Sequence, residues 1–245
     1  ALSDKCRAQV EQLFDWLVPP MLRCVTRACR MLMPMQEANM VQSLMRAYRG
    51  LMAELDEEGK VEAMGEKAVA AWLDSLFLFS LVWSVGGCVD EVGRERFDAL
   101  LRKLLINQPP EEYRQYVTGA ARKVAQNFPE KGLVYDFTFD KARGKWAGWM
   151  DGAPDFKPAP DAEFNALVVP TADTVRYTFL VDLSVTNGHP VLLTGPTGTG
   201  KSAYVKSYLM GLDSAKWTSM FFVFSAQPSA NQPQDIIDGK LDKRR

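Results

Sequence analysis

The sequence VLLTGPTGTGKSAYVKSYLM, residues 191–210, joins a short apolar run, a glycine-rich turn and a helix-like pattern. Within it, GPTGTGKS at residues 195–202 matches the spacing G-x-x-x-x-G-K-[ST] of a phosphate-binding loop. The stretch therefore predicts an α/β nucleotide-binding domain built around this loop. The residues that we expect to contact the nucleotide here are Gly195, Pro196, Thr197, Gly198, Thr199, Gly200, Lys201, Ser202 and Ala203.

The residue types of the loop suit the binding of a triphosphate. Glycines at 195, 198 and 200 let the backbone turn tightly, so that several N–H groups face the oxygens of a triphosphate. A helix that begins at Lys201 directs the positive end of its dipole at the same point. Lys201 supplies a positive charge to the β- and γ-phosphates, and the Ser202 hydroxyl can coordinate the bridging Mg²⁺. We expect ATP or ADP with Mg²⁺ as the ligand.

The flanks of the loop fit the same interpretation. Residues 191–194 predict a short buried strand, residues 201–210 predict a helix that ends at Gly211, and SMFFVFS at 219–225 predicts a second buried strand. A strand, loop, helix and strand in this order are what the motif requires, which makes an accidental glycine-rich turn the weaker explanation. Upstream, DTVRYTFLVDLSVTN at 173–187 predicts a helix that ends at Gly188.

Hydrolysis by this class of site also needs an apolar strand that ends in one or two carboxylates. No such strand follows Lys201, so we predict no catalytic residue in this chain and expect it to be a piece of a larger protein. Asp90 and Glu91 follow an apolar run, but they lie before the loop, and we interpret them as a helix start rather than metal ligands. His189, the only histidine, is interpreted as a turn residue rather than a base.

The bulk composition is that of an ordinary globular protein. The 245 residues allow one large or two small domains, and the apolar fraction of 47% is enough for a buried core. A net charge of -1 gives no overall attraction to nucleic acid or to an anionic membrane, so we expect neither as a partner. KLDKRR at 240–245 has no interleaved aromatics and is interpreted as a solvated helix end. The four cysteines match no zinc or CxxC spacing and indicate reduced thiols in an intracellular protein.

Residues 1–127 read as helices, because apolar residues recur at three- and four-residue spacing in 41–55 and 97–105. Pro19 and Pro20 are expected to break or kink the first helix. The most apolar segment, residues 68–87, is interrupted by Asp74. Its uncharged run from 75 to 89 is shorter than the roughly 18 residues of a membrane span, so we predict a core helix. The N-terminal residues do not read as a targeting peptide.

The pattern changes after Gly132. Apolar and polar residues alternate on both sides of KARGK in residues 133–151, which predicts a β-hairpin. Residues 152–164 are rich in proline and predict a linker. The predicted organisation is therefore a helical segment over 1–127, a hairpin and linker over 128–163, and the nucleotide-binding segment over 164–245.

Several stretches resemble the dynein heavy chain family. VVPTADTVRYTFLVDLSVTNGHPVLLTGPTGTGKS at 168–202 and FFVFSAQPSANQPQDIIDGKLDKRR at 221–245 resemble the start of the third AAA+ module of a dynein heavy chain. LFDWLVPPMLRCV at 13–25 and LVWSVGGCVDEVGRERFDALLRKLL at 81–105 resemble the helical lid of the second module. GPTGTGKS together with KLDKRR is more similar to axonemal inner-arm dyneins than to the cytoplasmic motor.

The resemblance implies a mixed fold, with an α-helical AAA+ lid followed by the first part of an α/β P-loop NTPase domain. It implies that Val168, Val169, Pro170 and Thr171 lie over the adenine, and that metal-binding carboxylates come after Arg245 in the same module. The parent would be an ATPase and microtubule motor of the cytoskeleton, in the axoneme of a cilium or flagellum. Its partners would be the rest of the heavy-chain ring, microtubules, and intermediate and light chains. In this family the third module is a nucleotide-dependent regulator.

The chain departs from the family pattern at Pro228 and Pro233, where we expect threonine. Pro233 lacks an N–H and is expected to delay the start of the helix through 234–241. Gly239 within that helix costs up to about 1 kcal/mol relative to alanine. Two alternatives stay open at this point. One is a nucleotide-binding scaffold that does not hydrolyse, and the other is an unrelated P-loop regulator.

Overall fold

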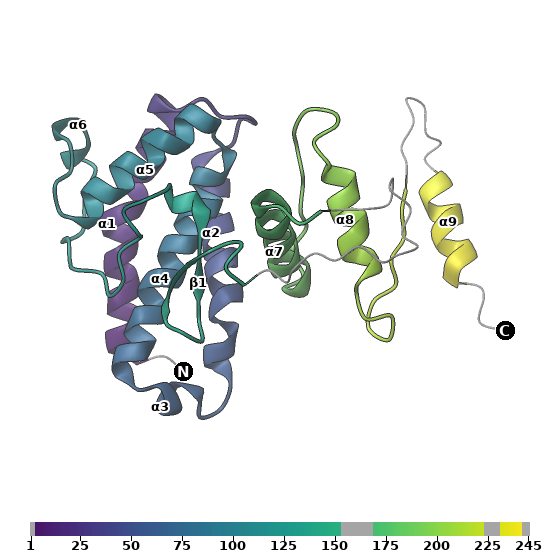
Figure 1. The fold of residues 1–245 in the computed structure, drawn as a ribbon, viewed down its shortest axis with the longest axis horizontal. Coiled ribbons are helices and arrows are strands. Elements are labelled where there is room, and N and C mark those ends of the chain that lie inside the picture. The colour runs from purple at the N-terminus through teal and green to yellow at the C-terminus, as the bar shows by residue number, and fades with distance from the viewer. Residues whose placement is uncertain (1–2, 153–168, 223–230, 242–245) are drawn as a thin grey trace. The chain divides into compact units, whose positions relative to one another are not determined.

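The computed structural model describes residues 3–152, 169–222 and 231–241 (Figure 1). The chain divides into two compact units, residues 1–204 and 205–245. The elements in the first part are α1 (Asp4–Ala28), α2 (Glu37–Met52), α3 (Lys60–Met64), α4 (Glu66–Ser84), α5 (Glu91–Leu105), α6 (Glu111–Arg114), β1 (Phe137–Asp140) and β2 (Lys145–Gly148). Short 3-10 helices occupy Ala53–Asp56, Gly86–Cys88 and Val134–Asp136. The later elements are α7 (Ala172–Thr186), α8 (Lys201–Met210) and α9 (Gln232–Leu241).

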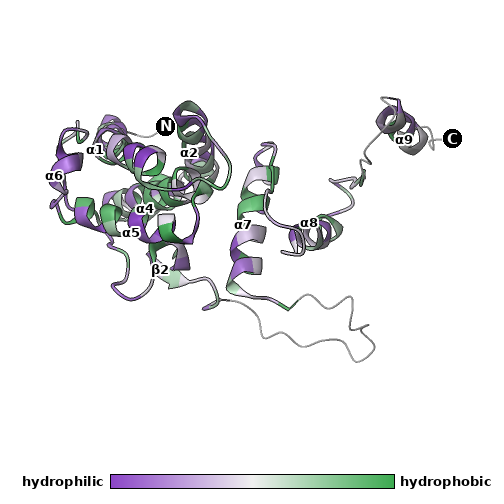
Figure 2. Ribbon diagram, turned by 90° about the horizontal axis from the view of Figure 1, so that it is seen from above, coloured by the Kyte–Doolittle hydropathy of each residue, from purple (hydrophilic) through white to green (hydrophobic). Residues whose placement is uncertain are grey.

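The helix α4 is the centre of the helical bundle. It packs against α1 and α2, and its buried side chains come from every side of the helix. Figure 2 shows polar and apolar residues on different sides of the bundle helices, as expected for helices that bury one face. The segment Glu66–Cys88 is long and apolar enough to cross a membrane, but 72% of its most apolar window is buried inside the protein. The prediction of a core helix is confirmed.

A buried carboxylate in α4 orders the segment around residues 122–126. Asp74 is 1% exposed, and its carboxylate accepts hydrogen bonds from the Gln9 side chain (2.7 Å) and from the amide of Ala125 (2.9 Å). The guanidinium of Arg122 forms an ion pair with the same carboxylate. The charge that interrupts the apolar run is therefore fully partnered, as a buried charge must be.

Of the predicted break or kink at Pro19 and Pro20, the break is wrong, because α1 runs without interruption from Asp4 to Ala28. A proline removes the hydrogen bond to the carbonyl four residues earlier, which for Pro19 is the carbonyl of Asp15. That carbonyl instead accepts hydrogen bonds from the Thr118 hydroxyl (2.9 Å) and the Gly119 amide (3.2 Å). A segment distant in sequence thus satisfies the group that the proline leaves free.

The predicted β-hairpin is confirmed. β1 and β2 pair antiparallel from Phe137↔Gly148 to Asp140↔Lys145. The turn closes with a hydrogen bond from the amide of Gly144, whose φ is +63°, to the Asp140 carbonyl (2.8 Å). Trp146 of β2 stacks on Phe128, with 4.1 Å between the ring centroids. The hairpin therefore contributes to the core of the helical bundle.

The interpretation of Asp90 and Glu91 as a helix start is also confirmed. Asp90 is the N-cap of α5, and its side chain accepts a hydrogen bond from the Gly93 amide (2.8 Å). This use of the carboxylate is the ordinary capping role of an aspartate.

The helix α7 packs against the bundle through aromatic rings. Phe179 contacts Phe79 and Trp149, with centroids 5.6 Å away in both cases. Tyr177 lies edge-on to Trp83 at 6.4 Å. The helix that leads to the phosphate-binding loop therefore belongs to the same compact unit as the bundle.

In the described residues, no strand is found in either run that was predicted as a strand near the loop. Residues 191–194 are irregular and exposed, with Leu192 76% exposed, and residues 219–222 are irregular as well. Extended backbone becomes a strand only when a neighbour accepts its hydrogen bonds, and no described segment pairs with either run. Residues 223–225 of the second run lie outside the described part of the chain.

The predicted delay at Pro233 is wrong, because α9 begins at Gln232. Pro233 lies in the first helical turn, where its missing N–H has no intrahelical partner to lose. The amide of Asp235 donates to the Asn231 carbonyl (2.9 Å), which closes this turn. Pro228, the linker residues 153–164 and the final residues 242–245 are outside the described ranges.

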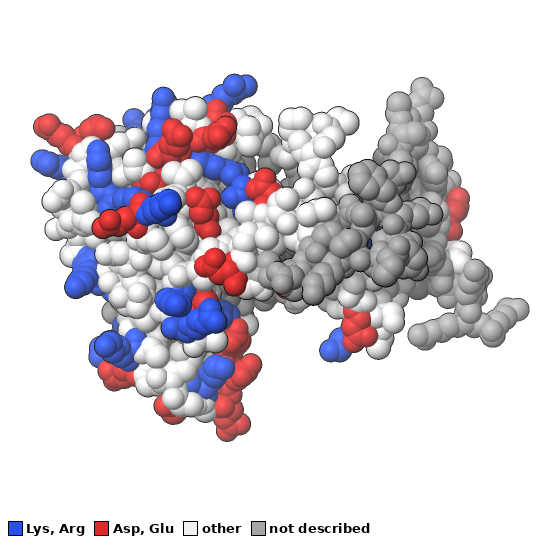
Figure 3. Space-filling view, viewed as in Figure 1, with Lys and Arg blue, Asp and Glu red and all other residues white. Residues whose placement is uncertain are grey.

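Charged side chains of both signs are mixed on the visible surface of the bundle (Figure 3). Lysines and arginines alternate with aspartates and glutamates, in keeping with the balance of 29 basic and 30 acidic residues. This face therefore offers no large field of one sign.

Candidate functional site

The helix α7 ends in a Schellman turn, and the chain continues from this turn to the loop. Gly188 has φ of +69°, and its amide donates to the Val185 carbonyl (3.0 Å). The amide of His189 donates to the Ser184 carbonyl (2.8 Å). His189 is thus a turn residue, as predicted, and Gly188 ends the helix because only glycine adopts this conformation without strain.

The loop itself is curled by its glycines. Gly195, Gly198 and Gly200 have φ values of +151°, +85° and +79°. A side chain at any of the three positions would be strained, so the backbone path requires the glycines of the motif. Residues 195–199 are exposed, which leaves this curl open to a ligand from solvent.

Lys201 is the first residue of α8, and its ammonium group lies over the loop. It donates to the carbonyl of Gly195 (2.8 Å), to the carbonyl of Pro196 and to the hydroxyl of Thr199 (3.1 Å). The Thr199 hydroxyl in turn donates to the Pro196 carbonyl (3.0 Å). One cation therefore stands at the N-terminal end of a ten-residue helix, where the helix dipole adds further positive potential.

The next residues of α8 are open to solvent. Ser202 and Ala203 are exposed in its first turn, and no hydrogen bond from the Ser202 hydroxyl to another described residue is recorded. A β-carbon at Gly200 would lie 2.9 Å from the ring of Tyr204, so that the ring closes one side of the loop. The residues Gly195 to Ala203 thus form one turn that leads directly into the first turn of α8.

The segment predicted to lie over the adenine has a structural role that sequence reasoning missed. Thr171 is the N-cap of α7, and its hydroxyl accepts a hydrogen bond from the Thr174 amide (3.2 Å). The signal was present as a threonine directly before a helical pattern. Val169 is 58% exposed, Val168 is outside the described residues, and no hydrogen bond recorded for residues 169–171 reaches the loop.

The described residues hold no cluster of three or more histidine, cysteine, aspartate or glutamate side chains that could bind a metal ion. Within the loop, the Ser202 hydroxyl is the oxygen that the motif assigns to Mg²⁺. A hydroxyl alone is a weak ligand for Mg²⁺, which needs phosphate or carboxylate oxygens as well. The donor set of the loop is therefore suited to a metal that arrives with a nucleotide.

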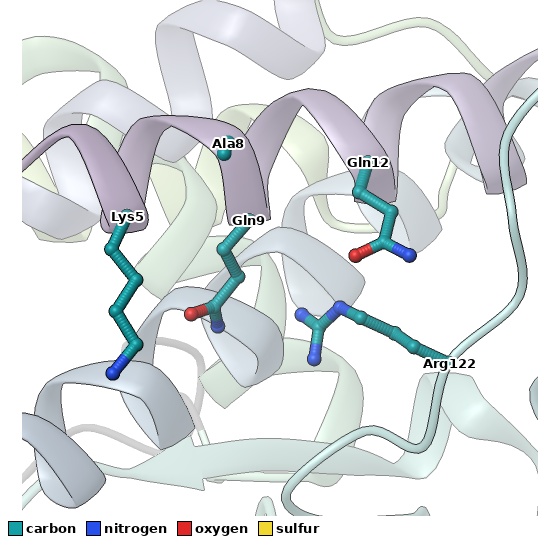
Figure 4. A pocket seen from close by; sticks show the side chains of 5 residues that line it. All are labelled: Lys5, Ala8, Gln9, Gln12 and Arg122. Atoms are coloured by element: carbon teal, nitrogen blue, oxygen red, sulfur yellow. The ribbon is translucent and has the colours of Figure 1, made fainter.

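A separate hollow of about 280 Å³ lies on the bundle, between α1 and the segment that carries Arg122 (Figure 4). Its lining residues are Lys5, Ala8, Gln9, Gln12 and Arg122. Both cations are already paired, Lys5 with Glu66 and Arg122 with Asp74. The hollow therefore offers no free charge to a ligand, in contrast to the loop.

Comparison with known protein families matches two consecutive parts of the chain, the helical bundle with its hairpin and the segment that carries the loop. Residues 10–151, more than half of the chain, match the dynein heavy chain AAA lid domain. The chain belongs to the dynein heavy chain family. Residues 156–245 match the P-loop containing dynein motor region, a type of region that binds nucleotides. The predicted fold class, a helical AAA+ lid followed by the start of a P-loop domain, is confirmed by these two matches.

The similar curated proteins are axonemal dyneins. The chain is 36% identical to dynein axonemal heavy chain 3 of Mus musculus over 247 residues, which cover 96% of this chain and 6% of that protein. It is 38% identical to mouse dynein axonemal heavy chain 12 over 240 residues, which cover 96% of this chain and 8% of that protein. A human heavy chain 12 match is 42% identical over 172 residues, 69% of this chain and 6% of the relative. The chain thus spans less than a tenth of these relatives' length.

Proposed function

We propose that this dynein segment spans the junction of the second and third AAA+ modules of an inner-arm axonemal heavy chain. Residues 1–127 are the lid of the preceding module, 128–163 a hairpin and linker, and 164–245 the first part of the next nucleotide-binding domain. The order of the two family matches, lid before P-loop, supports a junction between modules rather than a single module. The axonemal relatives support a place in the axoneme of a cilium or flagellum.

The loop binds ATP or ADP with Mg²⁺. The observation that carries this proposal is the curl of three glycines with positive φ, closed by the ammonium of Lys201 at the start of α8. The three loop oxygens that now accept from Lys201 are replaced by phosphate oxygens, which carry full negative charge and bind an ammonium more strongly. Ser202 contributes its hydroxyl to the magnesium ion.

The adenine lies against Val168, Val169, Pro170 and Thr171. The exposed apolar side chain of Val169 offers contact area to a base, and Thr171 fixes this segment to the start of α7. Since α7 ends in the turn that leads to the loop, one helix joins the base segment to the phosphate segment.

Nucleotide binding is tested with the 245-residue chain and a fluorescent ADP in the presence of Mg²⁺. Lys201→Ala removes the cation and is expected to weaken binding by roughly 10- to 100-fold, the equivalent of one charged hydrogen bond. Lys206→Ala removes an exposed charge from the same helix and should bind like the wild type. Equal affinity of Lys201→Ala and Lys206→Ala would remove the basis for the phosphate site.

The site regulates the parent motor rather than supplying its main hydrolysis. Support comes from α7, which packs on the lid through Phe179 and leads directly to the loop, so that a change at the loop reaches the neighbouring module. In the intact heavy chain, Lys201→Ala is expected to slow movement along microtubules in a gliding assay. Wild-type velocity would favour the alternative, a scaffold in which bound nucleotide only joins the modules.

A further inference from the structure

Two cysteines meet at the C-terminal end of α1. Cys24 lies in the last turns of the helix and is 1% exposed, and Cys29 caps the same end and is partly exposed. Their sulfur atoms are 3.9 Å apart, and both are free thiols. The segment after Cys29 is held to the start of α5 by hydrogen bonds from the Leu32 amide to the Cys88 carbonyl and from the Asp90 amide to the Arg30 carbonyl.

A tyrosine and an arginine lie close to this pair of thiols. The pKa of Cys24 is lowered, first by its hydrogen bond with Cys29 and to a lesser degree by Tyr113 and Arg96, while burial acts in the opposite direction. The same bond raises the pKa of Cys29, together with burial. The guanidinium of Arg96 is held nearby by its hydrogen bond to the carbonyl of Ala28. The pair thus lies beside a fixed cation.

The backbone allows the sulfurs to approach. A disulfide needs about 2.0 Å between sulfur atoms, so the pair must close by roughly 1.9 Å. Cys29 has extended backbone angles, φ −112° and ψ 153°, and lies past the last helical residue. The Cys29 thiol contacts the Gly93 carbonyl at 3.6 Å, a weak bond that a small rotation of the side chain breaks.

We propose that Cys24 and Cys29 are a redox-active dithiol that a peroxide converts into a reversible intramolecular disulfide. The partly exposed Cys29 sulfur attacks one peroxide oxygen, the O–O bond breaks, and the departing oxygen takes the Cys29 thiol proton and leaves as water. Cys29 is then a sulfenic acid. The Cys24 sulfur attacks the Cys29 sulfur, and the S–S bond forms as the bond from Cys29 sulfur to oxygen breaks. The leaving hydroxide takes the Cys24 thiol proton and becomes the second water.

The electrons and atoms balance in this sequence. Each sulfur loses one electron to the new S–S bond, and the two peroxide oxygens gain two electrons and end as water. Overall, two thiols and one hydrogen peroxide give one disulfide and two water molecules. A thiol reductant such as dithiothreitol reverses the reaction by thiol–disulfide exchange.

The other two cysteines provide internal controls. The Cys6 sulfur accepts from the Ser3 hydroxyl at 3.2 Å, and the Cys88 thiol donates to the Val85 carbonyl at 3.6 Å. Neither sulfur contacts a second cysteine sulfur in the described part of the chain. Of the four cysteines, only Cys24 and Cys29 are therefore expected to form a disulfide within the described part of the chain, and Cys6 and Cys88 should stay as thiols.

The experiment treats the 245-residue chain with hydrogen peroxide, blocks the remaining thiols with iodoacetamide and digests with trypsin. Trypsin cuts after Arg23, Arg27 and Arg30, so the disulfide joins the peptides CVTR (24–27) and ACR (28–30). We expect this linked pair to appear with a mass two hydrogens below the sum of the peptides, and to disappear after dithiothreitol. Alkylation of all four cysteines after peroxide, or linkage of Cys29 to Cys88, would overturn the proposal.

Two variants separate the roles of the sulfurs. In Cys24→Ala, the Cys29 sulfenic acid has no partner and is expected to be trapped by dimedone, whereas the wild type gives little adduct. Cys88→Ser should form the linked pair as the wild type does. A dimedone adduct of equal size at Cys29 in the wild type and in Cys24→Ala would contradict the proposed attack by Cys24. The wild-type peptide map decides the main point even if Cys24→Ala folds poorly.

Discussion

Two buried aspartates hold an irregular part of the chain, residues 122–134, against the bundle. Asp74 binds the amide of Ala125 and the guanidinium of Arg122, and Asp98 accepts from the amide of Val134 (2.8 Å). The sequence marked Asp74 only as a charge inside an apolar run. These two partners could not be predicted, because they lie about fifty residues later in a segment without periodicity.

Replacing Asp74 with alanine should destabilise the bundle strongly. The change leaves Arg122 without its partner and the Ala125 amide without an acceptor, and breaking a buried ion pair in this way costs about 3 kcal/mol or more. Chemical denaturation followed by tryptophan fluorescence measures the loss. Asp56→Ala removes an exposed aspartate and should change stability by less than about 0.5 kcal/mol. Similar values for both variants would contradict the role of Asp74.

At the scale of elements, the sequence predicted most helices and the hairpin, because these elements make their own hydrogen bonds locally. The hairpin at 137–148 and the helix at 201–210 are both found near their expected bounds. No strand is found at 191–194 or at 219–222, the described part of the strand predicted at 219–225, because a strand of a parallel sheet depends on partners distant in sequence. The continuity of α1 through its prolines was not predicted for the same reason, dependence on residues distant in sequence. Thr118 and Gly119 donate hydrogen bonds to the Asp15 carbonyl, more than a hundred residues earlier.

Gly119→Ala is expected to loosen the contact that keeps α1 intact at its prolines. A β-carbon at this position would lie 2.8 Å from the backbone nitrogen of Trp16 and from the β-carbon of Asp15, closer than real contacts allow. The segment must move away, so we expect a loss of about 2 kcal/mol, as for other overpacked sites. At Gly87 a β-carbon meets nothing within 4 Å, and Gly87→Ala is the matched control in thermal unfolding. Equal melting temperatures would show that the close approach is not required.

At the scale of the molecule, the sequence motif predicted a phosphate site at residues 195–203 but not how the elements around it pack. The motif alone gave the residues from Gly195 to Ala203, and their glycine conformations and the position of Lys201 agree with it. The packing of α7 on Phe79 and Trp149 could not be predicted from the sequence. The helical spacing of aromatic residues shows that one face of a helix is buried, but not which residues it packs against. The family matches then show that a lid domain is followed in this chain by a P-loop segment.

The most direct test of the central claim is amide hydrogen–deuterium exchange of the 245-residue chain, with and without saturating ADP and Mg²⁺. If the backbone at 195–203 closes around phosphate oxygens, its amides should exchange more slowly with nucleotide, while the hairpin at 137–148 exchanges as before. Unchanged exchange at 195–203 under saturating nucleotide would contradict the account.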